Sequence, residues 1–193
     1  AATGARVILA DEQAEFGGSL LSLSREIDGK PSVDWVRSAI DELAGHAEAT
    51  LLKRTTVVGL YDQNYLVALQ QRIDDLAPSS PANPRMRVWH IRAKQVILAT
   101  GSHERPLVFA DNDRPGTMLA SAALTYMNRY AALPCKRPVI VTNNDWAYET
   151  ARTFKAHGAD VTVADTRKSV ADDLKAEMAH LGIEVLANTT VTG

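Results

Sequence analysis

The chain has 193 residues, 46% of them hydrophobic and 23% charged, which is the composition of an ordinary globular protein. Its formal net charge of -2 excludes a bulk attraction to nucleic acid or to an anionic membrane, because phosphate binding requires clustered positive charge. No apolar stretch approaches the roughly 20 residues of a membrane span, and no signal sequence is evident. We therefore expect a cytoplasmic protein that binds neither nucleic acid nor membranes.

The first residues predict the end of a helix and then a parallel strand. Gly4 is typical of a helix C-terminus, and residues 7–11 form an apolar run that ends in Asp11 and Glu12. In a nucleotide-binding βαβ unit, a glycine-rich pyrophosphate loop follows the first strand, and a ribose-binding acid ends the second, about 20 residues later. The sequence therefore predicts that residues 7–11 are the second strand, and that the first strand and the glycine loop are missing.

The next elements predict a helix, a meander and a final parallel strand. Residues 33–43 have helical apolar spacing, with Ser32 as the N-cap. Strands are predicted at residues 50–53, 55–61, 64–70 and 86–92; the last three form an antiparallel meander joined by turns at 61–64 and 78–84. The apolar run 94–99 predicts a buried parallel strand, and its exit through Thr100 and Gly101 lets backbone approach a dinucleotide. This order resembles the FAD-type domain of glutathione-reductase-like flavoproteins.

A second unit follows, with strands predicted at 138–142, 159–165 and 183–186 and helices at 145–157 and 170–181. The turn at 142–147 has none of the glycines of a phosphate loop, and the side chains of Asn144 and Trp146 would crowd a pyrophosphate. This favours a nucleotide site that is weak or inactive.

The predicted fold class is α/β and Rossmann-like, of the two-dinucleotide-domain type. It combines a parallel sheet and an antiparallel β-meander with a second Rossmann-like unit. We predict a truncated FAD/NAD-binding-type domain at residues 1–110, a linker at 111–137 and a partial NAD(P)-type unit at 138–193.

No pattern in the sequence predicts catalytic residues or metal ligands. His103 and Glu104 are adjacent in an extended turn, and one histidine with one glutamate falls short of a metal ligand set. We interpret them as part of a structural turn in which Arg105 pairs with a nearby acid. The single cysteine, Cys135, excludes an internal disulfide and is expected to be inert.

Several segments together carry a family resemblance. They are Val-Ile-Leu-Ala-Thr-Gly-Ser-His-Glu-Arg-Pro-Leu-Val-Phe at 96–109, Asn-Asp-Arg-Pro-Gly-Thr-Met-Leu-Ala at 112–120, and the shorter segments 10–13, 16–20 and 141–145. In these segments the chain resembles the alpha subunits of heterotetrameric sarcosine oxidases, as an internal piece of a much longer subunit. The His-Glu-Arg-Pro and Arg-Pro-Gly sequences are more specific than Ala-Thr-Gly by itself.

The resemblance implies an oxidoreductase that demethylates sarcosine to glycine, forming hydrogen peroxide and either formaldehyde or methylenetetrahydrofolate. It implies beta, gamma and delta subunits as partners, FAD in the beta subunit, FMN at the alpha–beta interface, and tetrahydrofolate in a part of alpha outside this chain. The chemistry would then lie elsewhere, and the isolated piece is expected to be inactive and to self-associate through an open sheet edge.

For this region, the resemblance implies noncovalent NAD in the place where related proteins hold FAD. Asp11 and Glu12 would bind the adenosine ribose, with Gln13 beside them. The remaining implied cofactor contacts are Gly18 and Ser19 on the phosphate or ribose side, Val58 at adenine, and Ala99, Thr100 and Gly101 near the pyrophosphate.

Three other interpretations remain open. The chain could belong to a related flavin-dependent amine or proline dehydrogenase subunit, or to a stand-alone pyridine-nucleotide flavin reductase. A third alternative is a purely structural role in which both nucleotide sites are vestigial. A reductase requires an intact phosphate loop in each unit, which this sequence does not show.

Overall fold

The computed structural model describes residues 1, 3–72 and 84–192 and divides into two compact units. Unit 1 comprises Ala1–Leu20 and Ser24–Gly101, and unit 2 comprises Leu21–Leu23 and Ser102–Gly193. The predicted turn at 78–84 lies, except for Pro84, outside the described residues. None of the helices in the described ranges is long and apolar enough to cross a membrane. The domain limits predicted from the sequence remain a proposal.

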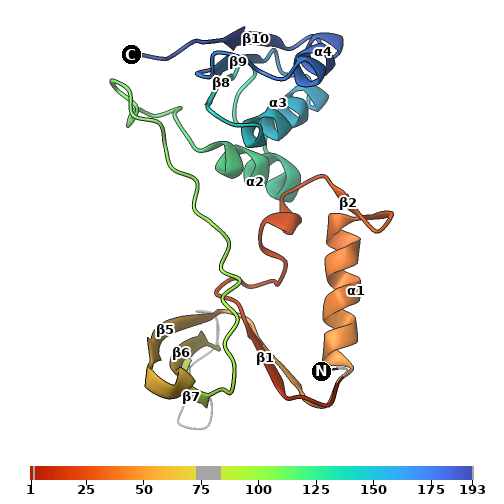
Figure 1. The fold of residues 1–193 in the computed structure, drawn as a ribbon, viewed down its shortest axis with the longest axis vertical. Helices are drawn as coiled ribbons and strands as arrows, with labels where there is room; N and C mark the ends of the chain where they lie inside the picture. Colours follow the sequence, from red (N-terminus) through yellow and green to blue (C-terminus); the bar gives the residue numbers. More distant parts are fainter. Residues whose placement is uncertain (2, 73–83, 193) are drawn as a thin grey trace. The chain divides into compact units, whose positions relative to one another are not determined.

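Unit 1 is built around a βαβ element (Figure 1). Strand β1 (Val7–Ala10) pairs in parallel with β4 (Ala49–Leu52), and helix α1 (Ser32–Ala44) connects them. Between β1 and α1 the chain forms the short helix η1 (Gly18–Leu21) and an antiparallel pair, β2 (Glu26–Ile27) with β3 (Lys30–Pro31). The residues that follow β1 therefore lie at the carboxyl end of a parallel strand.

Helix α1 begins differently from the prediction. Ser32 is its first residue and not its N-cap; Pro31 occupies the N-cap position, without a side-chain hydrogen bond. The Ser32 side chain is buried, and its hydroxyl donates to the carbonyl of Leu20 at 2.9 Å. A buried hydroxyl requires a hydrogen-bond partner, and here the carbonyl of Leu20 satisfies it in place of the helix end.

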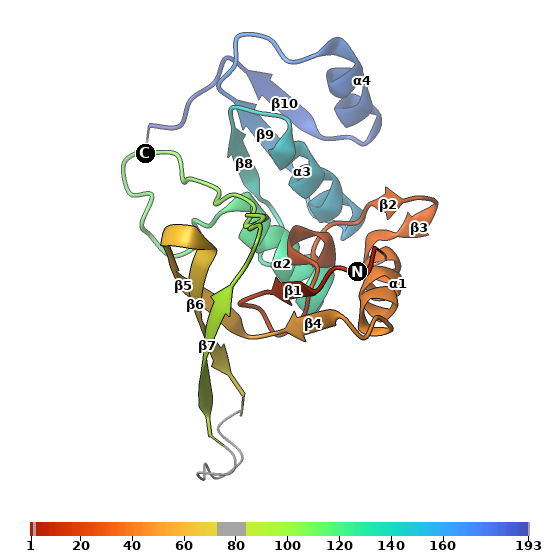
Figure 2. The same cartoon turned by 60° about the horizontal axis from the view of Figure 1, so that its bottom comes forward.

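The meander predicted from the sequence is confirmed. Strands β5 (Thr55–Tyr61), β6 (Tyr65–Gln71) and β7 (Met86–Arg92) form an antiparallel sheet in that order (Figure 2). The turn between β5 and β6 contains the short helix η2 (Asp62–Asn64). In this turn Gln63 and Asn64 have φ values of 58° and 55°, as a tight hairpin turn requires.

The strand predicted at residues 94–99 is wrong for this structure. Ile97 is 87% exposed and Leu98 is 72% exposed. Within the described part of the chain, residues 95–101 make no hydrogen bond and belong to no strand. An apolar sequence becomes a strand only where a neighbour supplies ladder hydrogen bonds, and among the described strands β1 pairs with β4 alone.

Unit 2 confirms the predicted second Rossmann-like unit. Strands β8 (Val139–Thr142), β9 (Thr162–Asp165) and β10 (Glu184–Ala187) form a parallel sheet in the order β10-β9-β8. Helix α3 (Trp146–Ala156) connects β8 to β9, and α4 (Asp172–His180) connects β9 to β10 (Figures 1 and 2). A further helix, α2 (Ala120–Tyr130), lies within the range predicted as a linker and packs against α3.

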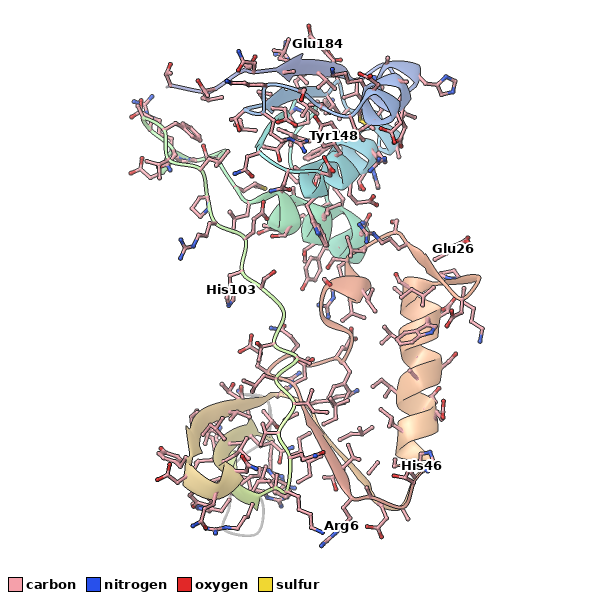
Figure 3. All side chains as sticks on the ribbon, viewed as in Figure 1. Arg6, Glu26, His46, His103, Tyr148 and Glu184 are labelled. Atoms are coloured by element: carbon pink, nitrogen blue, oxygen red, sulfur yellow. The ribbon has the colours of Figure 1, made fainter. Side chains whose placement is uncertain are left out.

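Helix α3 supplies much of the core of unit 2, because its apolar residues recur at helical spacing on one side. Tyr148 and Ala151 are fully buried, and Phe154 is nearly so. They pack with Val163 of β9 and Met178 of α4, both also fully buried. Tyr148 is labelled in Figure 3, in the part of the molecule formed by these elements. The core therefore fixes α3, the helix that follows the carboxyl end of β8.

Candidate functional site

Asp11 follows the last residue of β1, and two backbone hydrogen bonds fix its position. Its amide donates to the carbonyl of Leu52 at 3.0 Å, and its own carbonyl accepts from the amide of Thr55 at 2.8 Å. Its carboxylate Oδ1 accepts from the amide of Gln13 at 2.9 Å, while Oδ2 accepts no hydrogen bond from the described residues. The second oxygen is therefore available to a ligand hydroxyl.

Glu12 and Gln13 complete the turn after β1. Both side chains are exposed, and the Gln13 amide nitrogen Nε2 lies 3.5 Å from Glu12 Oε1. The carbonyl of Gln13 accepts from the amide of Arg54 at 2.9 Å, which ties this turn to the end of β4. The three predicted ribose-side residues therefore lie together in one anchored turn.

A cavity of about 150 Å³ opens beside Asp11. Its lining is mostly apolar and comes from β1, the segment between β1 and η1, η1 itself and α1: Leu9, Asp11, Phe16, Gly17, Leu20, Trp35, Val36, Ala39 and Ile40. Pockets for drug-sized ligands usually measure about 300–1,000 Å³, so this cavity is too small for a whole dinucleotide. It can accept only one group of such a ligand, next to the Asp11 carboxylate.

The loop before α1 passes this cavity. Gly17 and Leu20 line it, and the predicted contacts Gly18 and Ser19 lie between them in η1. Gly18 has a φ of 53°, and nothing lies within 4 Å of the position that a Cβ would take. A side chain there would strain the backbone, so glycine keeps the loop in this conformation. The structure therefore brings Gly18 and Ser19 into the neighbourhood of Asp11.

The structure does not link the other four predicted contact residues to the turn after β1. Among the described residues, no hydrogen bond connects them to Asp11, Glu12 or Gln13. Val58 lies on β5 at an irregularity between Val57 and Gly59, and it is 60% exposed. The other three lie in the exposed segment that follows β7: Ala99, Thr100 and Gly101. Their roles at adenine and pyrophosphate remain predictions.

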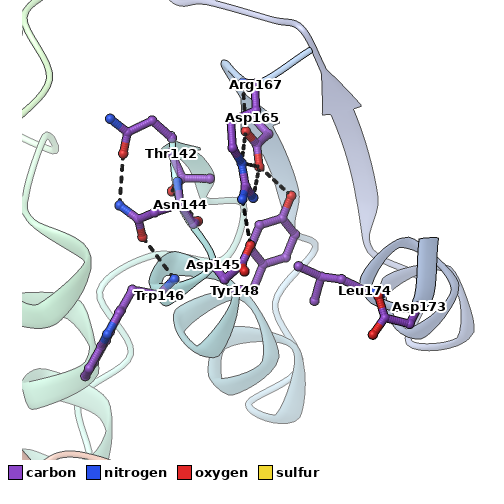
Figure 4. A network of polar contacts seen from close by, with 10 residues as sticks. Thr142, Asn144, Asp145, Trp146, Tyr148, Asp165, Arg167, Asp173 and Leu174 are labelled. Atoms are coloured by element: carbon purple, nitrogen blue, oxygen red, sulfur yellow. Dashed lines mark hydrogen bonds and ion pairs between the residues drawn. The ribbon is translucent and has the colours of Figure 1, made fainter. Parts of the chain in front are cut away.

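Unit 2 carries a second acid in the corresponding place, at the carboxyl end of β9. Asp165 is fully buried. Its Oδ2 accepts from the hydroxyl of Tyr148 at 2.8 Å and from Arg167 Nη2 at 2.7 Å, and its Oδ1 accepts from the amide and Nε of Arg167 at 2.9 and 3.0 Å. Arg167 Nη1 also lies 2.8 Å from Oδ1 of Asp145, just before α3 (Figure 4).

The residues of the turn between β8 and α3 form hydrogen bonds with one another. The hydroxyl of Thr142 accepts from the amide of Asn144 at 3.1 Å and donates to its carbonyl at 2.9 Å. The side-chain oxygen of Asn144 accepts from the amide of Trp146, the first residue of α3, at 2.9 Å (Figure 4). The amides at this helix N-terminus are thus partly satisfied by the chain's own side chains.

The ionisable groups around Asp165 stabilise one another. Burial favours the protonated form of Asp165, but hydrogen bonds from Arg167 and Tyr148 outweigh it and lower the pKa of this carboxyl. Burial and the neighbouring Asp165 carboxylate raise the pKa of Tyr148 to about 12. Hydrogen bonds to Asp165 raise the pKa of Arg167 against its own desolvation. At neutral pH the network therefore consists of a carboxylate, a guanidinium and a neutral phenol.

The motif at residues 103–105 serves the structure. Glu104 accepts hydrogen bonds from the amides of Ala120 and Ser121, at 3.2 and 2.8 Å, and so caps the N-terminus of α2. His103 lies on the extended segment labelled in Figure 3. In the described residues Arg105 forms no ion pair, so the acid partner predicted for it is not found.

Sequence reasoning missed two parts of this arrangement. The cavity beside Asp11 depends on Phe16 and Trp35, which are far apart in sequence and gave no motif. The network around Asp165 had a usable signal, since an arginine two residues after a strand-ending acid can fold back onto its carboxylate. The contribution of Tyr148 depends on the packing of α3 against β9.

The two units, each with an acid after or at the end of a parallel strand, define the class of two-unit dinucleotide-binding folds. The chain belongs to the pyridine nucleotide-disulphide oxidoreductase family, whose profile matches residues 1–193. This family implies binding of flavin and nicotinamide nucleotides.

Curated relatives confirm the resemblance found in the sequence. The chain is 47% identical over 191 residues to the sarcosine oxidase subunit alpha of Corynebacterium sp. (strain P-1), covering 98% of this chain and 20% of that protein. It is 42% identical over 187 residues to the sarcosine oxidase subunit alpha of Rhizobium meliloti (strain 1021), covering 96% of this chain and 19% of that protein. The chain thus spans about a fifth of the length of these relatives.

A solved structure agrees with the fold. The L-proline dehydrogenase from P. horikoshii matches with a TM-score of 0.62 and 20% sequence identity, covering 97% of this chain and 31% of that chain. At this level of identity the likeness concerns the fold alone.

Proposed function

We propose that this chain is the dinucleotide-binding region of the alpha subunit of a sarcosine oxidase, and that it holds NAD noncovalently in unit 1. Identities of 47% and 42% to alpha subunits support the assignment to this enzyme. The structural observation that carries the site is Asp11, whose Oδ2 accepts no hydrogen bond from the described residues and whose side chain lines a cavity. A ribose hydroxyl can donate to such an oxygen.

In this proposal Asp11 and Glu12 bind the adenosine ribose, and Gln13 fixes the turn that carries them. Gly18 and Ser19 approach the phosphate or ribose side, because their loop passes the same cavity. A bound nicotinamide dinucleotide supplies hydride-transfer chemistry, but these residues hold only its adenosine half. The remaining proposed contacts lie at adenine and at the pyrophosphate: Val58, Ala99, Thr100 and Gly101.

The proposal extends to the complete enzyme. It oxidatively demethylates sarcosine to glycine, with formation of hydrogen peroxide and formaldehyde or methylenetetrahydrofolate. It is a cytoplasmic heterotetramer with beta, gamma and delta subunits, in which FAD, FMN and tetrahydrofolate lie outside this region. This chain then contributes cofactor binding and scaffolding, while the amine is oxidised elsewhere.

The test compares NAD content in assembled enzymes purified in parallel. Asp11→Asn removes the charge but keeps the shape of the side chain, so we expect NAD affinity to fall about tenfold or more, as for a lost hydrogen bond to a charged group. Asp34→Asn changes an exposed acid on α1 and should leave NAD content unchanged. Flavin content should be equal in both variants. Retention of NAD by Asp11→Asn at the wild-type level and affinity would refute the assignment.

A further inference from the structure

The carboxyl ends of β8 and β9 in unit 2 form the edge at which a dinucleotide binds in this type of fold. We infer that unit 2 is closed to dinucleotides, because a clamp formed by Tyr148, Asp145, Asp165 and Arg167 occupies this edge. The clamp joins the end of β9 to the start of α3 by hydrogen bonds and ion pairs within the chain.

The carboxylate of Asp165 has no acceptor position left for a hydrogen bond from a ribose hydroxyl. A carboxylate offers about four lone-pair positions to donors. Four donor groups already point to Asp165: the hydroxyl of Tyr148 and the amide, Nε and Nη2 of Arg167, at 2.7 to 3.0 Å. Asp165 also has no exposed surface. A ribose hydroxyl would have to displace one of these donors and enter a closed interior.

Unit 1 of the same chain has an acid in the corresponding position whose carboxylate is more accessible. Asp11 follows β1 as Asp165 ends β9, yet among the described residues only one hydrogen bond, from the amide of Gln13, reaches the Asp11 carboxylate. Asp11 is partly exposed and lines a cavity, whereas Asp165 is fully buried. The same strand-end position therefore has opposite accessibility in the two units.

Backbone amides at the position of a phosphate loop also have hydrogen-bond partners within the chain. In a phosphate loop, glycines let backbone amides face the ligand directly. Here the side-chain oxygen of Asn144 accepts from the amide of Trp146, and the hydroxyl of Thr142 accepts from the amide of Asn144. Asn143 adds a side chain that bonds to Asn144 at 2.9 Å. These two amides already have hydrogen-bond acceptors within the chain, so they are not available to a pyrophosphate. Side chains also occupy the space that the glycines of a phosphate loop would leave open.

Arg167 connects these two regions. Its Nη2 binds the buried Asp165, and its Nη1 binds Asp145, whose side chain is 70% exposed (Figure 4). The amide of Thr166 also donates to the carbonyl of Thr142 at 2.9 Å, so backbone and side chains link the same two loops.

Exchange of hydride with a free pyridine nucleotide requires a site for that nucleotide next to a flavin. If unit 2 is closed, this chain does not act as a stand-alone pyridine-nucleotide reductase. The inference does not depend on the NAD site proposed for unit 1.

Hydrogen–deuterium exchange of the assembled enzyme tests the inference site by site. NAD⁺, NADH and NADPH are added separately in excess to enzyme from which bound nucleotide has first been removed, and peptides from the two units are compared. We expect no added protection at residues 142–148 or 163–167 with any of the three. Protection of these residues by any of the nucleotides would overturn the inference. Absence of protection at residues 10–20 as well would count against the NAD site of unit 1 and leave the closure of unit 2 supported.

A variant tests whether the clamp holds the loops together. Arg167→Gln removes the guanidinium, and Lys168→Gln, at the neighbouring exposed residue, is the matched control. Without any nucleotide, we expect residues 142–146 to exchange at least tenfold faster in Arg167→Gln than in Lys168→Gln. Equal exchange in the two variants would contradict the clamp. Should Arg167→Gln fail to assemble, the Tyr148→Phe variant gives the same comparison with the ion pairs left in place.

Discussion

Arg167 donates from Nη2 to the buried Asp165 at 2.7 Å, while its Nη1 lies 2.8 Å from the exposed Asp145. One guanidinium thus connects a fully buried carboxylate to one that is 70% exposed, and Arg167 itself is 30% exposed. A buried carboxylate is stable only while its partners remain, because the interior solvates charge poorly. The stability of unit 2 should therefore depend strongly on Arg167.

We expect Arg167→Ala to destabilise unit 2 by about 3–5 kcal/mol, the usual cost of leaving a buried charge without its partner. Slow hydrogen exchange of the β9 amides in the assembled enzyme measures this free energy of opening. Arg37→Ala is the control, since Arg37 pairs with Asp34 on the exposed side of α1 and should change stability by about 1 kcal/mol or less. Similar effects of the two substitutions would contradict the buried role of Asp165.

The clamp should be insensitive to pH between about 4 and 10. The pKa of Asp165 is lowered in the fold, so its contribution is complete above the ordinary carboxyl pKa of about 3.9 and is lost as pH falls through the lower, folded value. The pKa of Tyr148 is raised to about 12, so its contribution is complete below pH 10 and is lost as pH rises through about 12. Exchange of the β9 amides against pH measures both limits.

Tyr148→Phe should remove the alkaline limit and leave the acid limit in place. It removes one of the donors to Asp165, which we expect to cost about 1–3 kcal/mol at neutral pH. An alkaline loss of stability that persists unchanged in Tyr148→Phe would assign this limit to another group.

Arg152 should stabilise the packing of α3 against α4. Its Nε and Nη2 lie 2.6 and 2.7 Å from the two carboxylate oxygens of Glu177, and this hydrogen bonding lowers the pKa of Glu177. We expect Arg152→Ala to cost about 1–2 kcal/mol, and Arg152→Lys to recover only part of it, because lysine cannot bond to both oxygens in parallel. Exchange of the α4 amides measures the effect. An equal loss in Lys175→Ala, an exposed pair with Asp172, would contradict it.

Ala131→Gly should stabilise unit 2. Ala131 ends α2 with a φ of 51°, a left-handed conformation that is unfavourable for alanine and ordinary for glycine. We expect a gain of about 0.5–1 kcal/mol, measured by exchange of the α2 amides. The matched substitution Ala122→Gly, inside the same helix, should cost about 1 kcal/mol. A loss of stability in Ala131→Gly would show that α2 ends differently.

Local sequence patterns determined most of the elements in both units. Apolar runs predicted β1, β8 and β9, helical spacing predicted α1, and helix start and stop signals predicted α3 and α4, because these signals lie close together in sequence. The replaced glycines at 142–147 also indicated a weak nucleotide site in unit 2 from residue types alone.

Tertiary structure decided what the sequence could not. The apolar run at 94–99 has strand composition, but a strand requires a neighbour, and no described strand pairs with it. Asp11 and Asp165 both follow apolar runs in sequence, yet one keeps an oxygen available while the other is enclosed by Tyr148 and Arg167. Accessibility and hydrogen bonding depend on residues brought together by packing, so only the folded chain distinguishes the open acid from the closed one.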